Sequence, residues 1–80
     1  MNRVELGEFV VADPQICHGR LTFKGTRLFV SDVLEMVAEG MSWEAIIHEC
    51  HGSIGKPAIS EAIRLASKAL LAGSPDQLAA

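Results

Sequence analysis

Aromatic residues and long apolar runs are scarce in this chain of 80 residues. The three phenylalanines and one tryptophan are too few for an aromatic core, so we expect a core of valine, isoleucine, leucine and alanine. No apolar run approaches the roughly 20 residues that a membrane-spanning helix requires. Residues Met1–Glu8 also lack the apolar segment of a secretory signal. We therefore expect a protein of the cytoplasm that does not enter membranes.

An excess of basic charge is also absent. Seven lysines and arginines stand against ten acidic residues, which gives a net charge of −3. A domain that binds nucleic acid by itself usually has a basic excess, because neutralised phosphates dominate its affinity. The basic residues are nevertheless clustered in two stretches, so local basic patches stay open: Arg20, Lys24 and Arg27 in the first, and Lys56, Arg64 and Lys68 in the second.

Cysteine and histidine are few, and their spacing does not predict a metal site. A zinc site needs about four converging ligands, usually in paired motifs. The chain has no such pair among its candidates, which are Cys17, His18, His48, Cys50 and His51. We expect both cysteines to be reduced, with Cys50 in the core and the histidines of its helix at the surface.

The sequence also lacks a catalytic set. No nucleophile is paired with a base and an orienting group. The serines are typical of caps and turns, and the glutamates fall on polar helix faces. A chain this short has little room to enclose a substrate pocket of the usual size. We therefore expect a non-enzymatic protein without a cofactor.

The first thirty residues are predicted to form short strands. Phe9–Ala12 is rich in β-favouring residues and stops at Asp13, which is followed by proline. Leu21–Phe23 alternates apolar and polar residues, and Gly25 supplies a turn. Arg27–Val30 resumes the β-prone pattern. We predict a hairpin formed by the last two segments, with one strand before it.

The remaining residues are predicted to form three helices. Ser31 is the expected N-cap of the first, and Gly40 ends it. Ser42 caps a second helix that runs to His51, and Pro57 opens a third that runs to Leu71. The chain is thus predicted to be one domain over residues 1–80, with strands in 1–30, helices in 31–72 and a frayed tail in 73–80. Structural turns are expected at Asp13, Gly19, Gly25, Gly40 and Gly52.

The second and third helices have the anatomy of a helix-turn-helix unit, with Gly52–Lys56 as the turn. The third would be the recognition helix, and its candidate DNA- or partner-binding residues are Lys56, Ser60, Arg64 and Lys68. Glu61 lies near its start and is expected to repel phosphate. A three-helix bundle without DNA contact would use the same packing, so both interpretations stay open.

A second candidate set surrounds the Gly25 turn and consists of Arg20, Lys24, Thr26 and Arg27. The planar guanidinium of Arg27 can hold a carboxylate with two hydrogen bonds, and Asp13 is the expected partner across the hairpin. Alternatively, the three basic residues meet phosphate or an acidic partner protein.

Several of these residues occur together in a known family. The pattern extends over residues 9–71 and comprises Asp13-Pro14, Ile16-Cys17, Gly19, Gly25-Thr26-Arg27, Val30, Gly40 and the helical stretch 59–66. With these residues the chain resembles the domain of unknown function 433 family.

The resemblance implies a tri-helical, homeodomain-like or winged-helix fold that often forms dimers. Members are commonly encoded beside PIN-like ribonuclease toxins and are proposed to be VapB-type antitoxins. The implied function is to bind and neutralise the toxin and to repress the shared operon by binding operator DNA. The alternative is a small homodimeric protein-interaction module that does not bind nucleic acid.

Overall fold

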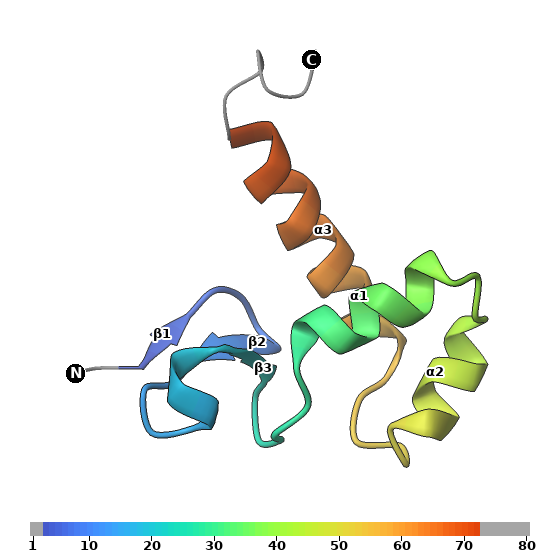
Figure 1. The fold of residues 1–80 in the computed structure, drawn as a ribbon, viewed down its shortest axis with the longest axis horizontal. Coiled ribbons are helices and arrows are strands. Elements are labelled where there is room, and N and C mark those ends of the chain that lie inside the picture. The colour runs from blue at the N-terminus through green and yellow to red at the C-terminus, as the bar shows by residue number, and fades with distance from the viewer. Residues whose placement is uncertain (1–2, 73–80) are drawn as a thin grey trace.

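A computed structural model describes residues 3–72 as a small antiparallel sheet followed by three helices (Figure 1). The fold is mainly helical with strands at its N-terminus, as predicted. Its elements are β1 (Val4–Glu5), β2 (Val10–Ala12), the 3-10 helix η1 (Cys17–Gly19), β3 (Leu21–Phe23), α1 (Val30–Ala38), α2 (Trp43–Glu49) and α3 (Lys56–Ala72). Within the described residues, no helix is long and apolar enough to cross a bilayer.

The sheet has the order β1-β2-β3, and both pairs are antiparallel. The predicted hairpin between Leu21–Phe23 and Arg27–Val30 is wrong, because β3 pairs along its length with β2. Only a single bridge joins Thr22 to Phe29, since the chain enters α1 at the next residue. The two-residue strand β1 was missed because so short a segment shows no periodicity.

The helix boundaries follow the predictions to within a few residues. The side chain of Ser42 caps α2, since its Oγ accepts a hydrogen bond from the backbone N–H of Ala45 at 3.1 Å. Ser31 is not an N-cap, because α1 already starts at Val30 with Phe29 in the cap position. The helix α2 ends at Glu49, two residues earlier than expected, because His51 adopts a positive φ of 54°.

The core lies where the sheet meets the three helices. Its most deeply buried large apolar side chains are Val10, Phe23, Val33, Ile46 and Ile59, each no more than 1 % exposed. Apart from Phe23 these are aliphatic, as the composition predicted. Cys50 is also buried, as expected, and burial raises the pKa of its thiol, with the charge of Glu49 adding to the effect. His48 and His51 are exposed, as predicted.

The last two turns of α3 project away from this core (Figure 1). Every residue from Ala66 to Ala72 is exposed, and Leu70 and Leu71 are 61 % and 71 % exposed. Alanine, leucine and lysine are strong helix formers, so the helix can continue without support from the core. We refer to residues 66–72 as the arm.

Candidate macromolecule-binding surfaces

Helices α2 and α3 form a unit held together by the turn between them. The turn is tied to α2 by two backbone hydrogen bonds, from the N–H of Gly52 to the oxygen of Ile47 and from the N–H of Ser53 to the oxygen of Cys50, both at 3.0 Å. Ile54 and Ala58, at the end of the turn and the start of α3, are buried. The relative position of the two helices is therefore fixed by the core.

Four residues that the sequence indicated as binding residues follow one another along the outer face of α3. Lys56, Ser60, Arg64 and Lys68 are four positions apart, which places them on one side of a helix. The three basic residues are exposed and Ser60 is half-buried, whereas Ala58, Ile59 and Ala62 are buried. The structure therefore presents these four residues, which we call the outer face of α3, to solvent.

At the start of α3, Lys56 is paired within the chain. Its Nζ lies 3.3 Å from Oε2 of Glu44 in the first turn of α2. The pKa of the Glu44 carboxyl is lowered, first by a hydrogen bond from its own backbone N–H and second by Lys56. Both side chains are exposed, so solvent screens this pair and a phosphate can compete for the lysine.

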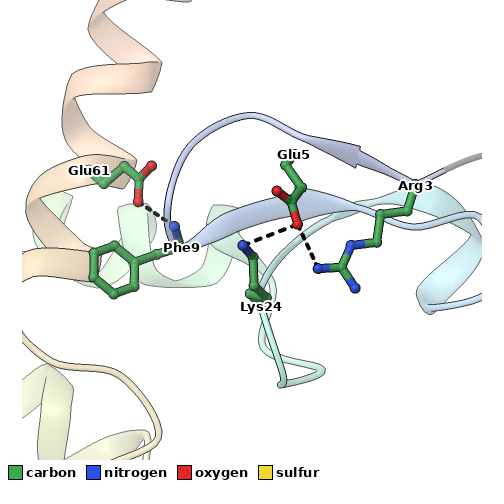
Figure 2. Close-up of polar contacts among 5 residues, drawn as sticks. All are labelled: Arg3, Glu5, Phe9, Lys24 and Glu61. Atoms are coloured by element: carbon green, nitrogen blue, oxygen red, sulfur yellow. Dashed lines mark hydrogen bonds and ion pairs between the residues drawn. The ribbon is translucent and has the colours of Figure 1, made fainter.

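The carboxylate of Glu61 is turned toward the N-terminal segment. Its Oε2 accepts a hydrogen bond from the backbone N–H of Phe9 at 2.7 Å, and the side chain is half-buried (Figure 2). Glu61 was expected to repel phosphate, and this contact occupies one of its oxygens inside the fold. The two residues are 52 positions apart, so no pattern in the sequence could reveal the contact.

Next to this contact lies a shallow hollow of about 400 Å³. It is lined by Glu8 and Phe9 on one side and by Pro57, Ser60, Glu61 and Arg64 on the other. Two carboxylates therefore border the first turns of α3, where only Arg64 supplies positive charge to the hollow. The residues that line the hollow therefore carry a net negative charge.

In the second candidate set, Arg20 and Lys24 contact groups of the same chain. The guanidinium carbon of Arg20 lies 3.8 Å from the ring centroid of Phe29, a cation–π contact. The Nη2 of Arg20 also donates to Oγ of Ser31 at 3.4 Å. Arg20 thus packs on the chain that enters α1.

Lys24 is held by the edge of the sheet. Its Nζ lies 3.2 Å from Oε2 of Glu5, which also accepts a hydrogen bond from Nη2 of Arg3 at 2.8 Å (Figure 2). These contacts lower the pKa of the Glu5 carboxyl, Arg3 first and Lys24 second. Lys24 also lines a hollow of about 410 Å³ together with Ser53 and Ala58, so it lies beside the turn before α3.

Thr26 and Arg27 have different surroundings. Thr26 is part of the turn itself, since its Oγ1 donates to the backbone oxygen of Phe23 at 2.8 Å and accepts from the N–H of Leu28 at 3.0 Å. Arg27 is exposed and makes no ion pair with any residue of 3–72. The expected pair with Asp13 does not form there. Asp13 instead accepts a hydrogen bond from the N–H of Gln15 at 2.9 Å.

The glycines predicted at turns adopt backbone conformations that other residues rarely adopt. Gly25 and Gly40 have φ values of 78° and 88°, and Gly19 and Gly52 are also in the positive range. These positive φ values allow the tight turn before Thr26 and Arg27 and the turns that follow α1 and α2.

The structure contains one surface that the sequence did not indicate, an apolar groove of about 240 Å³ between the sheet, α1 and the second half of α3. Its lining is entirely apolar and includes Leu6, Leu21, Leu34, Leu65, Ala66 and Ala69. Leu6 and Leu21 are 42 % and 40 % exposed. The groove could not be predicted because three separate parts of the chain supply its walls.

These surfaces are suited to binding. Exposed lysine and arginine side chains can contact phosphate or carboxylate groups, and the groove can accept apolar side chains. Among residues 3–72, no group of three or more histidine, cysteine, aspartate or glutamate side chains is placed to hold a metal ion.

A comparison with known families matches most of the chain. A family model described as protein of unknown function (DUF433) matches residues 10–66, well over half of the chain. The chain belongs to the DUF433 family. The matched segment begins with β2 and ends where the arm of this DUF433 protein begins. No curated protein and no solved structure matches the chain.

Proposed function

We propose that this DUF433 protein is the antitoxin of a type II toxin–antitoxin pair that binds a PIN-like ribonuclease toxin and its own operator DNA. In this proposal α2 and α3 act as a helix-turn-helix of the homeodomain or winged-helix kind. The observation that carries the DNA-binding part is the outer face of α3. Its polar and basic residues are presented to solvent while the opposite face of the same helix is buried.

A helix exposed in this way can enter the major groove of DNA, which is wide enough to accept it. Arg64 lies in the middle of the outer face and can contact a guanine edge or a phosphate. Lys56 lies about two turns before it and Lys68 about one turn after it, and both would contact the sugar–phosphate backbone. The inward orientation of Glu61 supports the proposal, because its carboxylate is hydrogen-bonded within the fold.

Binding of the toxin is supported by membership of the DUF433 family, whose members are proposed to be antitoxins, and by the charge around the Gly25 turn. PIN-like ribonucleases carry a cluster of acidic residues, and a basic surface is complementary to such a cluster. Arg27 is the member of the Arg20, Lys24 and Arg27 set that is exposed and makes no ion pair with residues 3–72. We therefore assign it the leading role in contacting the toxin.

The second candidate function is that of a protein-interaction module without nucleic-acid binding. The net charge of −3 favours it, as do the two glutamates beside the first turns of α3. Both would weaken the sequence-independent attraction to DNA.

A salt titration distinguishes the two functions. The chain is titrated with the duplex upstream of its own reading frame and with a random duplex of equal length. Operator binding requires an affinity that falls steeply with salt and exceeds that for random DNA. Arg64→Ala should weaken binding about tenfold, and Arg3→Ala, which removes an equal charge from the sheet edge, should not. Equal, weak binding of both duplexes would leave the interaction module as the function.

The toxin part is tested with the product of the neighbouring gene. Co-purification of that product, and inhibition of its ribonuclease activity, should be weakened by Arg27→Ala while the melting temperature of the variant stays unchanged. An Arg27→Ala variant that unfolds, or that inhibits the toxin as well as wild type does, would remove Arg27 from the interface. A neighbouring gene unrelated to ribonucleases would contradict the antitoxin proposal itself.

A further inference from the structure

We propose that the arm and the apolar groove form a homodimer interface, in which the arm of each chain lies in the groove of a second copy. The homodimer was expected from the sequence, and the structure points to the surface that forms it. The inference does not depend on the proposed function, since it concerns only the association of the chain with itself.

The first observation is a continuous apolar surface around the arm. Single exposed leucines are ordinary on soluble proteins, but contiguous apolar patches indicate an interface. Leu6 and Leu21 line the groove, and Leu70 extends from the arm that forms one of its walls. The exposed apolar surface therefore involves the sheet, α1 and the arm.

The second observation is that α3 carries both small side chains and a large apolar side chain that can pack against them in a second copy. Ala66 and Ala69 are small and lie in the groove wall, where they permit close approach of another helix. Leu70 follows directly and supplies a large side chain that can enter a groove. When two copies are related by a two-fold axis with their α3 helices antiparallel, each helix offers its alanines to the leucine of the other.

The buried area also favours a second copy. The part of α3 from Ala62 to Ala72 is about 16 Å long, so a foreign helix docked in one groove would make a single short contact and leave Leu70 outside. A two-fold arrangement makes the contact twice. This doubling brings the buried area toward the roughly 800 Å² per partner of a standard interface.

The third observation is complementary charge. Beyond Glu61 the charged residues of α3 are Arg64 and Lys68, whereas the exposed charged residues of α1 and its C-cap are all acidic: Asp32 and Glu35 in the helix and Glu39 at the C-cap. None of these five makes an ion pair with a residue of 3–72. Leu34 of α1 lines the groove, so an arm lying there brings Lys68 toward the acidic α1 of the other copy.

The test is the mass of the full chain in solution, measured by sedimentation over a range of concentrations. Wild type should sediment at twice the 8.6 kDa of one chain. Ala69→Glu places a charge in the groove wall and should give a monomer. Ser67→Glu adds the same charge on another side of the arm and should leave the dimer intact. Both positions are exposed in the single chain, so both variants should fold.

A second variant keeps the test decisive if Ala69→Glu fails to fold. Leu70→Ala retains a helix-favouring residue and should raise the dimer dissociation constant at least tenfold with an unchanged circular dichroism spectrum. A wild-type chain that is monomeric at about 100 µM would overturn the proposal. So would a dimer that tolerates Ala69→Glu and Leu70→Ala, because that dimer would use a different surface.

Discussion

Glu61 connects the first segment of the chain to α3 through one hydrogen bond, and the strength of that bond can be measured. The bond is charge-assisted and half-buried, so Glu61→Ala removes it and leaves the N–H of Phe9 without this acceptor. We expect a loss of about 1–3 kcal/mol in the free energy of unfolding, determined by urea denaturation. Glu49→Ala, which removes an exposed carboxylate from α2, should change the stability far less.

Gly7 provides an independent check of the same contact. A Cβ added at Gly7 would overlap Oε1 of Glu61, so the carboxylate would have to move, and we expect this movement to weaken its bond to Phe9. Gly7→Ala should therefore be destabilising in wild type but nearly neutral when Glu61 is already alanine. Additive effects of the two substitutions would show that they do not act through a shared contact.

Two threonines, Thr26 in the turn and Thr22 in the core, should respond in opposite ways to substitution by valine. Oγ1 of Thr26 makes two hydrogen bonds in the turn, so Thr26→Val should cost about 1–3 kcal/mol, and Thr26→Ser should recover most of it. Oγ1 of Thr22 is fully buried and has no hydrogen-bond partner among residues 3–72. Thr22→Val should therefore stabilise the fold by about 1 kcal/mol. Equal losses at both positions in thermal denaturation would contradict this account.

At the scale of the elements, α2 depends on its cap. Ser42→Ala removes the hydrogen bond to Ala45 and should lower stability by about 1 kcal/mol, while Ser42→Asp should preserve it. Chemical denaturation of the three proteins provides the comparison. A Ser42→Asp variant as unstable as Ser42→Ala would show that the cap contributes little to the fold.

Local patterns predicted the helices better than the sheet. The stripe of Trp43, Ile46 and Cys50 and the four-residue spacing of the outer face of α3 are visible along the sequence, because a helix brings nearby residues together. Strand pairing is decided by distant residues. A β-prone run such as Arg27–Val30 cannot show that Val10–Ala12 is the partner that β3 selects.

The same difference between nearby and distant residues explains which features of the candidate surfaces could be predicted from the sequence. The basic residues of α3 and of the Gly25 turn were found because they are spaced along one element or one turn. The residues of the same chain that pair with these basic residues were not predicted. The contacts of Lys56 with Glu44 and of Lys24 with Glu5 bridge separate elements, and so do the walls of the apolar groove.

At the scale of the whole molecule, the body and the arm should differ in stability. Residues around Ile59 are anchored in the core, whereas the residues of the arm have few contacts within the chain. Amide hydrogen exchange should therefore be slow at Ile59 and Ala62. In a dilute sample it should be fast at Ala69 and Leu70.

Raising the protein concentration should slow exchange in the arm, because association buries the arm and its groove. The measurement distinguishes an arm that is protected by association from an arm whose helix is stable by itself. Arm amides that are equally protected at every concentration would contradict the predicted dependence.

The positive φ of His51 has a practical consequence. A side chain other than glycine or asparagine in this left-handed conformation costs roughly 1 kcal/mol, and His51 is exposed, so its ring is not needed for packing. His51→Asn would relieve that strain while keeping a Cβ that limits the freedom of the unfolded chain. His51, which follows α2, therefore offers a way to obtain a more heat-resistant form of the protein for crystallisation, without altering any of its candidate surfaces.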